Sequence, residues 1–376
     1  MPEPLAMRAI EADTAFPGGN GLIAVGDDGD DLVIRPDHRD TDGSWFYWCV
    51  RLRGAAGRRV RVRLAQADAI AAHGPALSLD GGRTWSWLGR GCVLGDGFAV
   101  DIPAGAAEAQ LSMGMPYGLR DWRAAVADAP QRQRLAVETL CRTRAGRDVP
   151  LARVAAAGPV RRQALVTARH HACEMMAGYV VEGFVAAALA ADAPPGLEIL
   201  AVPFVDLDGV EAGDQGKNRR PHDHARDYAG DRPLYPECAA LKEIVRSSPA
   251  LAVIDLHCPW ISGPGNEAIY QVGLGDERRW RDQRAFAATL ARANRSPLPY
   301  APVDDIPYGV GWNVAANYGA GRSLIQWSSE QPAVRLATTI EIPYALARGA
   351  AVDQASARAF GIALHAAVVE HDAAES

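Results

Sequence analysis

The hydrophobic positions along the chain follow two different rhythms. In the first part, short stretches such as Trp45–Arg53 and Arg59–Leu64 alternate between apolar and polar residues, and turn sequences such as Asp42-Gly43 separate them. Alternation with a period of two is typical of strands with one buried face, and closely spaced turns favour antiparallel pairing. We therefore expect residues 1–118 to form an antiparallel β-sandwich domain.

The pattern changes in the second part of the chain. A polar, helix-favouring stretch from Leu119 to Leu140 is expected to connect the two parts. Compact apolar runs then alternate with helical patterns, which is typical of buried strands with helices between them. The expected strands are Gln163–Thr167, Ile199–Val205, Leu251–Leu256 and Leu336–Ile342, and the expected helices are Glu174–Ala191, Pro236–Val245, Glu277–Ala293 and Val352–Glu370. Residues 119–376 are thus predicted to form an α/β domain with a mixed sheet.

Composition narrows the possible partners. The chain has 376 residues, and no apolar run reaches the roughly 18 residues that a membrane span needs. The net charge of -6 offers no basic field for nucleic acid or an anionic membrane. Six cysteines without a CxxC pair are typical of reduced thiols. Because residues 1–15 carry no apolar signal segment, we expect a cytoplasmic protein without nucleic-acid or membrane partners.

Three polar residues with metal-binding chemistry follow the predicted strands. His171 and Glu174 come just after the first run, and His257 ends the third. An imidazole and a carboxylate three residues apart at a helix entry can face one cation. A catalytic zinc takes three such ligands and leaves a fourth position for water. The spacing of His171 and Glu174 occurs by chance in many chains, so the prediction depends on His257 joining them.

Two further features add candidate chemistry. Glu341 is a carboxylate in an otherwise apolar strand, where it either pairs with an arginine or serves as a general base beside a metal-bound water. The segment Lys217–Tyr228 is dense in charged residues. Its arginines could hold a substrate carboxylate and a developing oxyanion, or the segment could be a solvated loop with local ion pairs.

These motifs together resemble a known family. The segments that carry the resemblance are His170-His171-Ala172-Cys173-Glu174, Asp208-Gly209-Val210, Asp223-His224-Ala225-Arg226, Asp255-Leu256-His257 and Thr339-Ile340-Glu341-Ile342-Pro343-Tyr344. Their order is that of zinc carboxypeptidases of the carboxypeptidase A type, over roughly residues 135–365. The first part, with Trp45-Phe46-Tyr47-Trp48, the segment Ser78–Trp85 and Gly114-Met115-Pro116-Tyr117, is similar to the β-sandwich of the cytosolic carboxypeptidase subfamily.

The resemblance implies a role for each matching residue. His171, Glu174 and His257 would hold one zinc ion per chain, and Glu341 would be the general base. Asp223 would orient His171, and Arg226 would bind the terminal carboxylate of the substrate. Ala225 stands where the family has asparagine. The carbonyl-polarising arginine aligns with Gly216, so Lys217, Arg219 or Arg220 would take its place, and we favour Arg219. Tyr318 would be an aromatic cap over bound substrate.

The leading hypothesis is a zinc metallocarboxypeptidase that removes a C-terminal residue from a peptide or protein, with an acidic residue suggested by the resemblance. Ala225 supports an alternative, a zinc amidase or deacylase acting on a small acylated amino acid or a cell-wall peptide. A third hypothesis is an inactive binding protein that uses the β-sandwich. The presence of all three expected ligands and the expected base argues against it.

Overall fold

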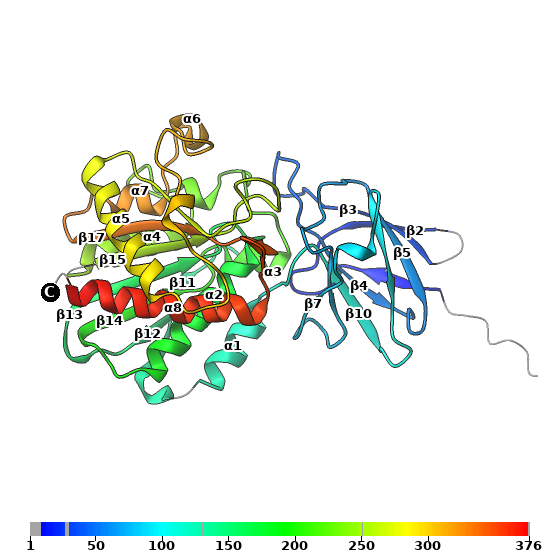
Figure 1. Cartoon of the computed structure of the whole chain (residues 1–376), viewed down its shortest axis with the longest axis horizontal. Helices are drawn as coiled ribbons and strands as arrows, with labels where there is room; N and C mark the ends of the chain where they lie inside the picture. The colour runs from blue at the N-terminus through cyan, green and yellow to red at the C-terminus, as the bar shows by residue number, and fades with distance from the viewer. Residues whose placement is uncertain (1–8, 27–29, 130, 250, 375–376) are drawn as a thin grey trace, which may run out of the picture.

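A computed structural model of the chain describes residues 9–26, 30–129, 131–249 and 251–374. The prediction about a signal segment rests partly on residues 1–8, which lie outside the described residues. Figure 1 shows two regions, a pair of packed sheets and a larger sheet with helices.

The N-terminal region contains two five-stranded sheets. The first has the order β1 (Glu11–Asp13), β4 (Cys49–Arg53), β10 (Glu108–Ser112), β6 (Ala76–Ser78) and β7 (Ser86–Trp87). The second has the order β2 (Leu22–Val25), β3 (Asp31–Arg35), β5 (Arg59–Leu64), β9 (Gly97–Asp101) and β8 (Val93–Leu94). Strand β5 shows how the alternation works, because Val60, Val62 and Leu64 are buried.

One strand pair differs from the predicted antiparallel arrangement. Strands β3 and β5 run parallel, while the other pairs within these two sheets are antiparallel. The chain passes through β4 in the opposite sheet between them, and such a crossover brings the chain back in the same direction. Trp48 stacks on Phe98 of the second sheet with ring centres 6.0 Å apart. This contact joins the two sheets in one core.

The C-terminal region is built on a mixed seven-stranded sheet. Its order is β11 (Leu135–Arg142), β12 (Asp148–Val154), β14 (Pro195–Val202), β13 (Ala157–Ala168), β15 (Leu251–His257), β17 (Val334–Glu341) and β16 (Tyr270–Val272). The four central strands are parallel, and the outer pairings are antiparallel. The four strands expected from apolar runs are these central strands, which confirms the predicted α/β class with a mixed sheet.

Helices cover the sheet (Figure 1). Helix α8 (Gln354–Ala374) packs against both α2 (Met175–Ala190) and α5 (Glu277–Ala293), and α4 (Pro236–Ser247) contacts α7 (Leu324–Ser328). Glycines let α2 and α8 approach closely, because a Cβ at Gly183 would lie 2.0 Å from the Arg358 carbonyl oxygen. The shorter elements are α3 (Leu207–Ala212), α6 (Ala315–Tyr318), β18 (Leu346–Ala347), β19 (Ala350–Ala351) and the 3₁₀ turns Arg90–Cys92, Arg132–Arg134, His224–Arg226 and Pro302–Asp304.

The connecting helix is shorter than the sequence predicts. Helix α1 spans Leu119–Ala127, and the second half of the expected helix contributes the strand β11. Strand β11 lies at the edge of the sheet and is mostly exposed, so its polar residues did not distinguish it from a solvated helix. The prediction of one helix from Leu119 to Leu140 is therefore wrong.

Specific contacts join the two regions. The Trp87 indole N–H donates to the Val352 carbonyl at 2.8 Å. The Asp40 carboxylate accepts hydrogen bonds from the backbone N–H groups of Gln215 and Gly216 at 3.1 and 2.8 Å. The N-terminal region thus holds the loop of the C-terminal region that contains Gln215 and Gly216.

All six cysteines are free thiols, as the spacing predicts. Among the described residues, no helix combines the length and apolar character needed to cross a bilayer.

Candidate active site

Three parallel strands end at the same edge of the large sheet, and the candidate side chains lie at or just after their ends. The last residues of β15 and β17, His257 and Glu341, are partners in the strand register. Strand β13 ends at Ala168, and His171 lies in the turn that leads into α2. Parallel strands share one direction, so their carboxyl ends gather there. The fold therefore brings together residues that are far apart in the sequence.

Two histidines converge on one carboxylate. The His171 Nδ1 atom lies 2.8 Å from Glu174 Oε1, and the His257 Nδ1 atom lies 2.8 Å from Glu174 Oε2. All three side chains are buried. Burial opposes ionisation of Glu174, but the charges of Lys217, His171 and His257 hold its pKa well below the usual range. Glu174 is therefore a carboxylate among basic groups.

Each histidine is oriented by its own aspartate. The His171 Nε2 atom lies 3.2 Å from Asp223 Oδ1, and the His257 Nε2 atom lies 3.0 Å from Asp255 Oδ2. A ring nitrogen held by a carboxylate leaves the other nitrogen to act as a ligand. Both Nδ1 atoms consequently face the same point next to Glu174.

This donor set fits zinc. Two imidazole nitrogens and one carboxylate are the ligands of many catalytic zinc sites, and an aspartate behind each histidine is a usual support. His171, Glu174 and His257 could thus hold the ion, with Asp223 and Asp255 behind them.

Asp255 is the functional residue that sequence reasoning missed. Its carboxylate lies 2.9 Å from His170 Nδ1 as well as contacting His257, and it accepts a hydrogen bond from the Thr167 hydroxyl. His170 extends this hydrogen-bond network to Tyr228, whose hydroxyl lies 2.7 Å from His170 Nε2. A signal was present in the sequence, because residues two apart on a strand share a face and Asp255 precedes His257 by two.

Glu341 lines the same cavity as His171, Glu174 and His257, and one of its oxygens has no hydrogen-bond partner among the described residues. Its Oε2 atom is buried and accepts no hydrogen bond within the described part of the chain. Burial raises the pKa of Glu341 to about 7; the nearby Glu174 carboxylate adds to the rise, and charge on His257 opposes it. A carboxyl group with a pKa near neutrality can both accept and return a proton.

Lys217 is the cation that contacts Glu174. Its ammonium group pairs with Glu174 and donates to the Cys258 carbonyl at 3.0 Å. Burial disfavours the charged form, but the Glu174 carboxylate outweighs it and raises the pKa of Lys217. Lys217 is therefore a fixed positive charge in the site.

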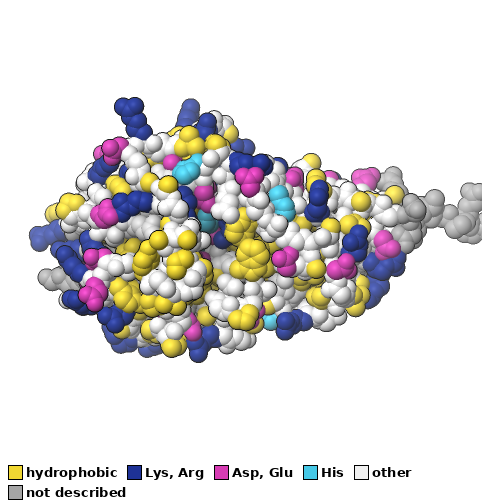
Figure 2. Space-filling view, turned by 90° about the horizontal axis from the view of Figure 1, so that it is seen from above, with side chains coloured by type: hydrophobic (Ala, Val, Ile, Leu, Met, Phe, Trp, Pro, Cys, Tyr) yellow, Lys and Arg dark blue, Asp and Glu magenta, His cyan; other side chains and the backbone are white. Residues whose placement is uncertain are grey.

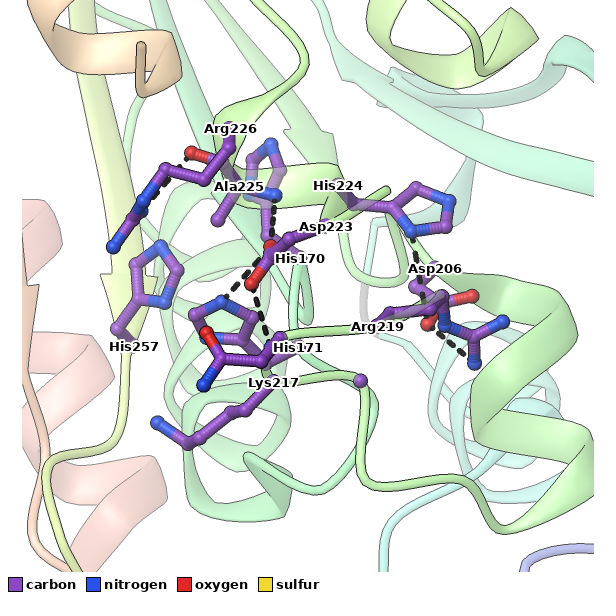
Figure 3. A network of polar contacts seen from close by, with 12 residues as sticks. His170, His171, Asp206, Lys217, Arg219, Asp223, His224, Ala225, Arg226 and His257 are labelled. Atoms are coloured by element: carbon purple, nitrogen blue, oxygen red, sulfur yellow. Dashed lines mark hydrogen bonds and ion pairs between the residues drawn. The ribbon is translucent and has the colours of Figure 1, made fainter. Parts of the chain in front are cut away.

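Arg219, the residue favoured from the sequence, lies elsewhere. Its guanidinium is 3.0 Å from Asp206 and 2.5 Å from Asp214, and it is not among the residues that line the cavity. Figure 3 shows Arg219 beside Asp206, away from His171 and His257. Arg220 also points away from the site and pairs with Asp42 at 2.9 Å. Asp40 holds the backbone of this loop just before Lys217, which lines the cavity, whereas Arg219 does not; sequence spacing alone could not distinguish the two.

Arg226 and Tyr318 lie together on another side of the cavity. The Arg226 guanidinium carbon is 5.0 Å from the centre of the Tyr318 ring. No carboxylate of a described residue lies within ion-pair distance of Arg226, whose hydrogen bond goes to the Ala225 carbonyl at 3.2 Å. Ala225, which stands where the resembling family has asparagine, is buried and does not line the cavity. An asparagine at another position, Asn218, does line it. Arg226 therefore has donors free for an anion.

These groups share one cavity of about 420 Å³. Much of its wall is aromatic. Figure 2 shows hydrophobic side chains beside a hollow in which histidine and acidic side chains come into view. The aromatic residues that line the cavity are Trp45, Trp260, Tyr270, Trp312 and Tyr318. Trp45 comes from the N-terminal region, so both regions build the cavity.

Comparison with known proteins identifies the fold. A scan against protein-family models finds no match, and neither does a search of the curated proteins. Among solved structures, the metallo-carboxypeptidase from Burkholderia cenocepacia is similar over 98% of this chain and 100% of its own, with a TM-score of 0.77 and 19% identity. The chain therefore has the metallo-carboxypeptidase fold.

Two further structures show how far this similarity extends. The metallo-carboxypeptidase from Pseudomonas aeruginosa, solved with (2-guanidinoethylmercapto)succinic acid, covers 96% of this chain and 98% of its own at 18% identity and a TM-score of 0.70. Carboxypeptidase A from Helicoverpa armigera covers 69% of this chain and 75% of its own at 12% identity and a TM-score of 0.50. The similarity to the bacterial enzymes thus includes the N-terminal sheets, and the fold expected from the sequence motifs is confirmed.

Proposed function

We propose that the protein is a zinc metallocarboxypeptidase that holds one zinc ion through His171, Glu174 and His257. The observation that carries the proposal is the convergence of two Nδ1 atoms and one carboxylate at the strand ends, with Glu341 and Arg226 lining the same cavity. Bound zinc would polarise the scissile carbonyl and acidify a water molecule. In this proposal the chain has two domains, residues 1–118 and 119–376. The protein is expected in the cytoplasm.

Each remaining residue has a defined task. Glu341 takes a proton from the attacking water and returns it to the leaving nitrogen, which its raised pKa permits. Lys217 takes the role expected of Arg219 and stabilises negative charge that develops on the carbonyl oxygen. Arg226 binds the terminal carboxylate of the substrate, and Tyr318 packs over Arg226.

The charges in the cavity argue against release of an acidic residue. Lys217 is paired with Glu174, and Arg226 is committed to the terminal carboxylate. An acidic side chain would find no further lysine or arginine among the described residues that line the cavity. We therefore infer that the released residue is not the acidic one suggested by the family resemblance.

Metal analysis tests the proposed ligands. The wild-type protein should bind one zinc ion per chain, and His257→Ala should lose most of it. His224→Ala is the matched control, because His224 is also buried but stacks on Tyr235 with ring centres 3.5 Å apart and outside the cavity. Full zinc content in His257→Ala would show that the ligands are misassigned.

A peptide screen tests the reaction. Peptides ending in each residue type should be cleaved when the C-terminus is free and resist cleavage when it is amidated, because Arg226 needs a carboxylate. Arg226→Lys should raise KM, since an ammonium group cannot form two parallel hydrogen bonds. Equal cleavage of free and amidated peptides would favour the amidase, and a protein without zinc or turnover would favour the binding protein.

A further inference from the structure

One wall of the cavity has no task in the proposed reaction. Trp45 and Trp260 meet there with ring centres 5.2 Å apart, and both line the cavity. Trp45 lies in the loop between β3 and β4 of the N-terminal region, and Trp260 lies in the loop after β15. This wall is therefore built by both regions.

The two tryptophans do more than close the seam between the regions. Phe46 packs against Tyr344 with ring centres 5.5 Å apart, and both residues are fully buried. Trp260 packs on the same Phe46 at 5.0 Å but remains 38% exposed. The Phe46–Tyr344 contact already seals the seam. An aromatic ring that keeps an open face on a cavity wall is typical of a binding surface.

The position of this wall indicates which part of a substrate would meet it. The Lys217 ammonium lies 5.4 Å from the centre of the Trp45 ring, whereas Arg226 lies against Tyr318. Figure 3 shows Lys217 and Arg226 on opposite sides of His171 and His257. A peptide with its terminal carboxylate at Arg226 and its scissile bond beside the histidines would extend toward Lys217. Its next residue would then reach the two tryptophans.

We propose that Trp45 and Trp260 form a subsite for an aromatic or bulky apolar side chain on the residue that precedes the scissile bond. The proposal rests on the proposed function, which sets the direction of the substrate. Two indole rings gain most from an apolar partner, and an acidic side chain would lose its hydration against them. A basic side chain would be repelled by the Lys217 ammonium, which lies 5.4 Å from the centre of the Trp45 ring.

The test compares acetyl-Gly-Phe-X with acetyl-Gly-Ala-X, where X is the residue that the wild-type enzyme releases fastest. Wild type should prefer the phenylalanine peptide in kcat/KM by about tenfold, as expected for one buried aromatic contact. Trp260→Ala should reduce this ratio toward one. Trp45→Phe keeps the packing on Phe46 with a smaller ring, and it should reduce the ratio partially.

Trp87→Ala is the matched control. Trp87 also belongs to the N-terminal region and contacts the larger one, but it does not line the cavity. It should keep the wild-type ratio. A wild-type ratio near one, or a ratio unchanged in Trp260→Ala, would overturn the subsite while leaving the proposed carboxypeptidase intact.

A binding measurement separates the subsite from the reaction. Calorimetry of both peptides with zinc-loaded Glu341→Gln, with and without Trp260→Ala, needs no turnover. Tighter binding of the phenylalanine peptide that depends on Trp260 would support the subsite even if no peptide is hydrolysed. Equal binding of the two peptides would overturn it.

Discussion

The charged residues of strand β5 and those at the ends of β13, β15 and β17 differ in their surroundings. On β5, Arg59 pairs with Asp101 at 2.8 Å, and both side chains are more than 60% exposed. At the sheet edge, Glu174, His257 and Glu341 are buried within one cluster. Exposed pairs are screened by water and contribute little, whereas buried charges need specific partners. A buried, incompletely paired cluster is therefore the better indicator of function.

The largest expected effect comes from removing the proposed base, the buried Glu341. Glu341→Gln should lower kcat by at least about 10²-fold to 10⁴-fold, because the same carboxylate transfers both protons. Zinc content should stay at the wild-type level, since Glu341 is not a proposed ligand. Steady-state kinetics with metal analysis measures both. A variant with near-normal turnover would exclude the base role.

The aspartates behind the histidines should have a smaller effect. Asp255→Asn should weaken zinc binding by about 10-fold to 100-fold, because the amide supports His257 less well than a carboxylate. Competition with a chelator measures the affinity. Asp223→Asn provides the parallel test at His171. Unchanged affinity in both variants would mean that the two aspartates only fill space.

The raised pKa of Glu341 also predicts how the stability of the metal-free protein depends on pH. The folded state binds the proton more tightly than the unfolded state, with a pKa of about 7 against 4.5. This contribution to stability is fully present below about pH 4.5 and is lost as the pH rises through about 7. The Glu341→Gln variant has no titrating group at this position, so its stability does not show this loss. The Tm of Glu341→Gln should therefore rise relative to that of wild type between pH 5 and pH 8, and a constant difference would contradict the assignment.

The smallest effect should come from the exposed face of β5. Arg59→Ala should change the free energy of unfolding by less than about 0.5 kcal/mol, because an exposed ion pair is screened and flexible. Denaturant unfolding measures the change. A loss of several times this value would mean that the exposed pairs stabilise the sandwich after all.

Much of the architecture could be predicted because it depends on local periodicity. Apolar runs marked the four central strands, and alternation marked β5. The ends of parallel strands lie at one edge of a sheet, so the sequence positions of His171, His257 and Glu341 were enough to predict that they meet. Strand β11 escaped prediction because an exposed edge strand lacks a clear apolar pattern.

The α/β class, the strand ends and the residues that gather there could be predicted from local sequence, because they follow from which side chains must be buried. The folded structure was needed to show that Lys217 faces the cavity while Arg219 pairs with Asp206 and Asp214. Asp40 of the other region holds the backbone of this loop. The folded structure was also needed to place Trp45, which reaches the cavity across the seam. Contacts between distant segments set these orientations, and local sequence carries no record of them.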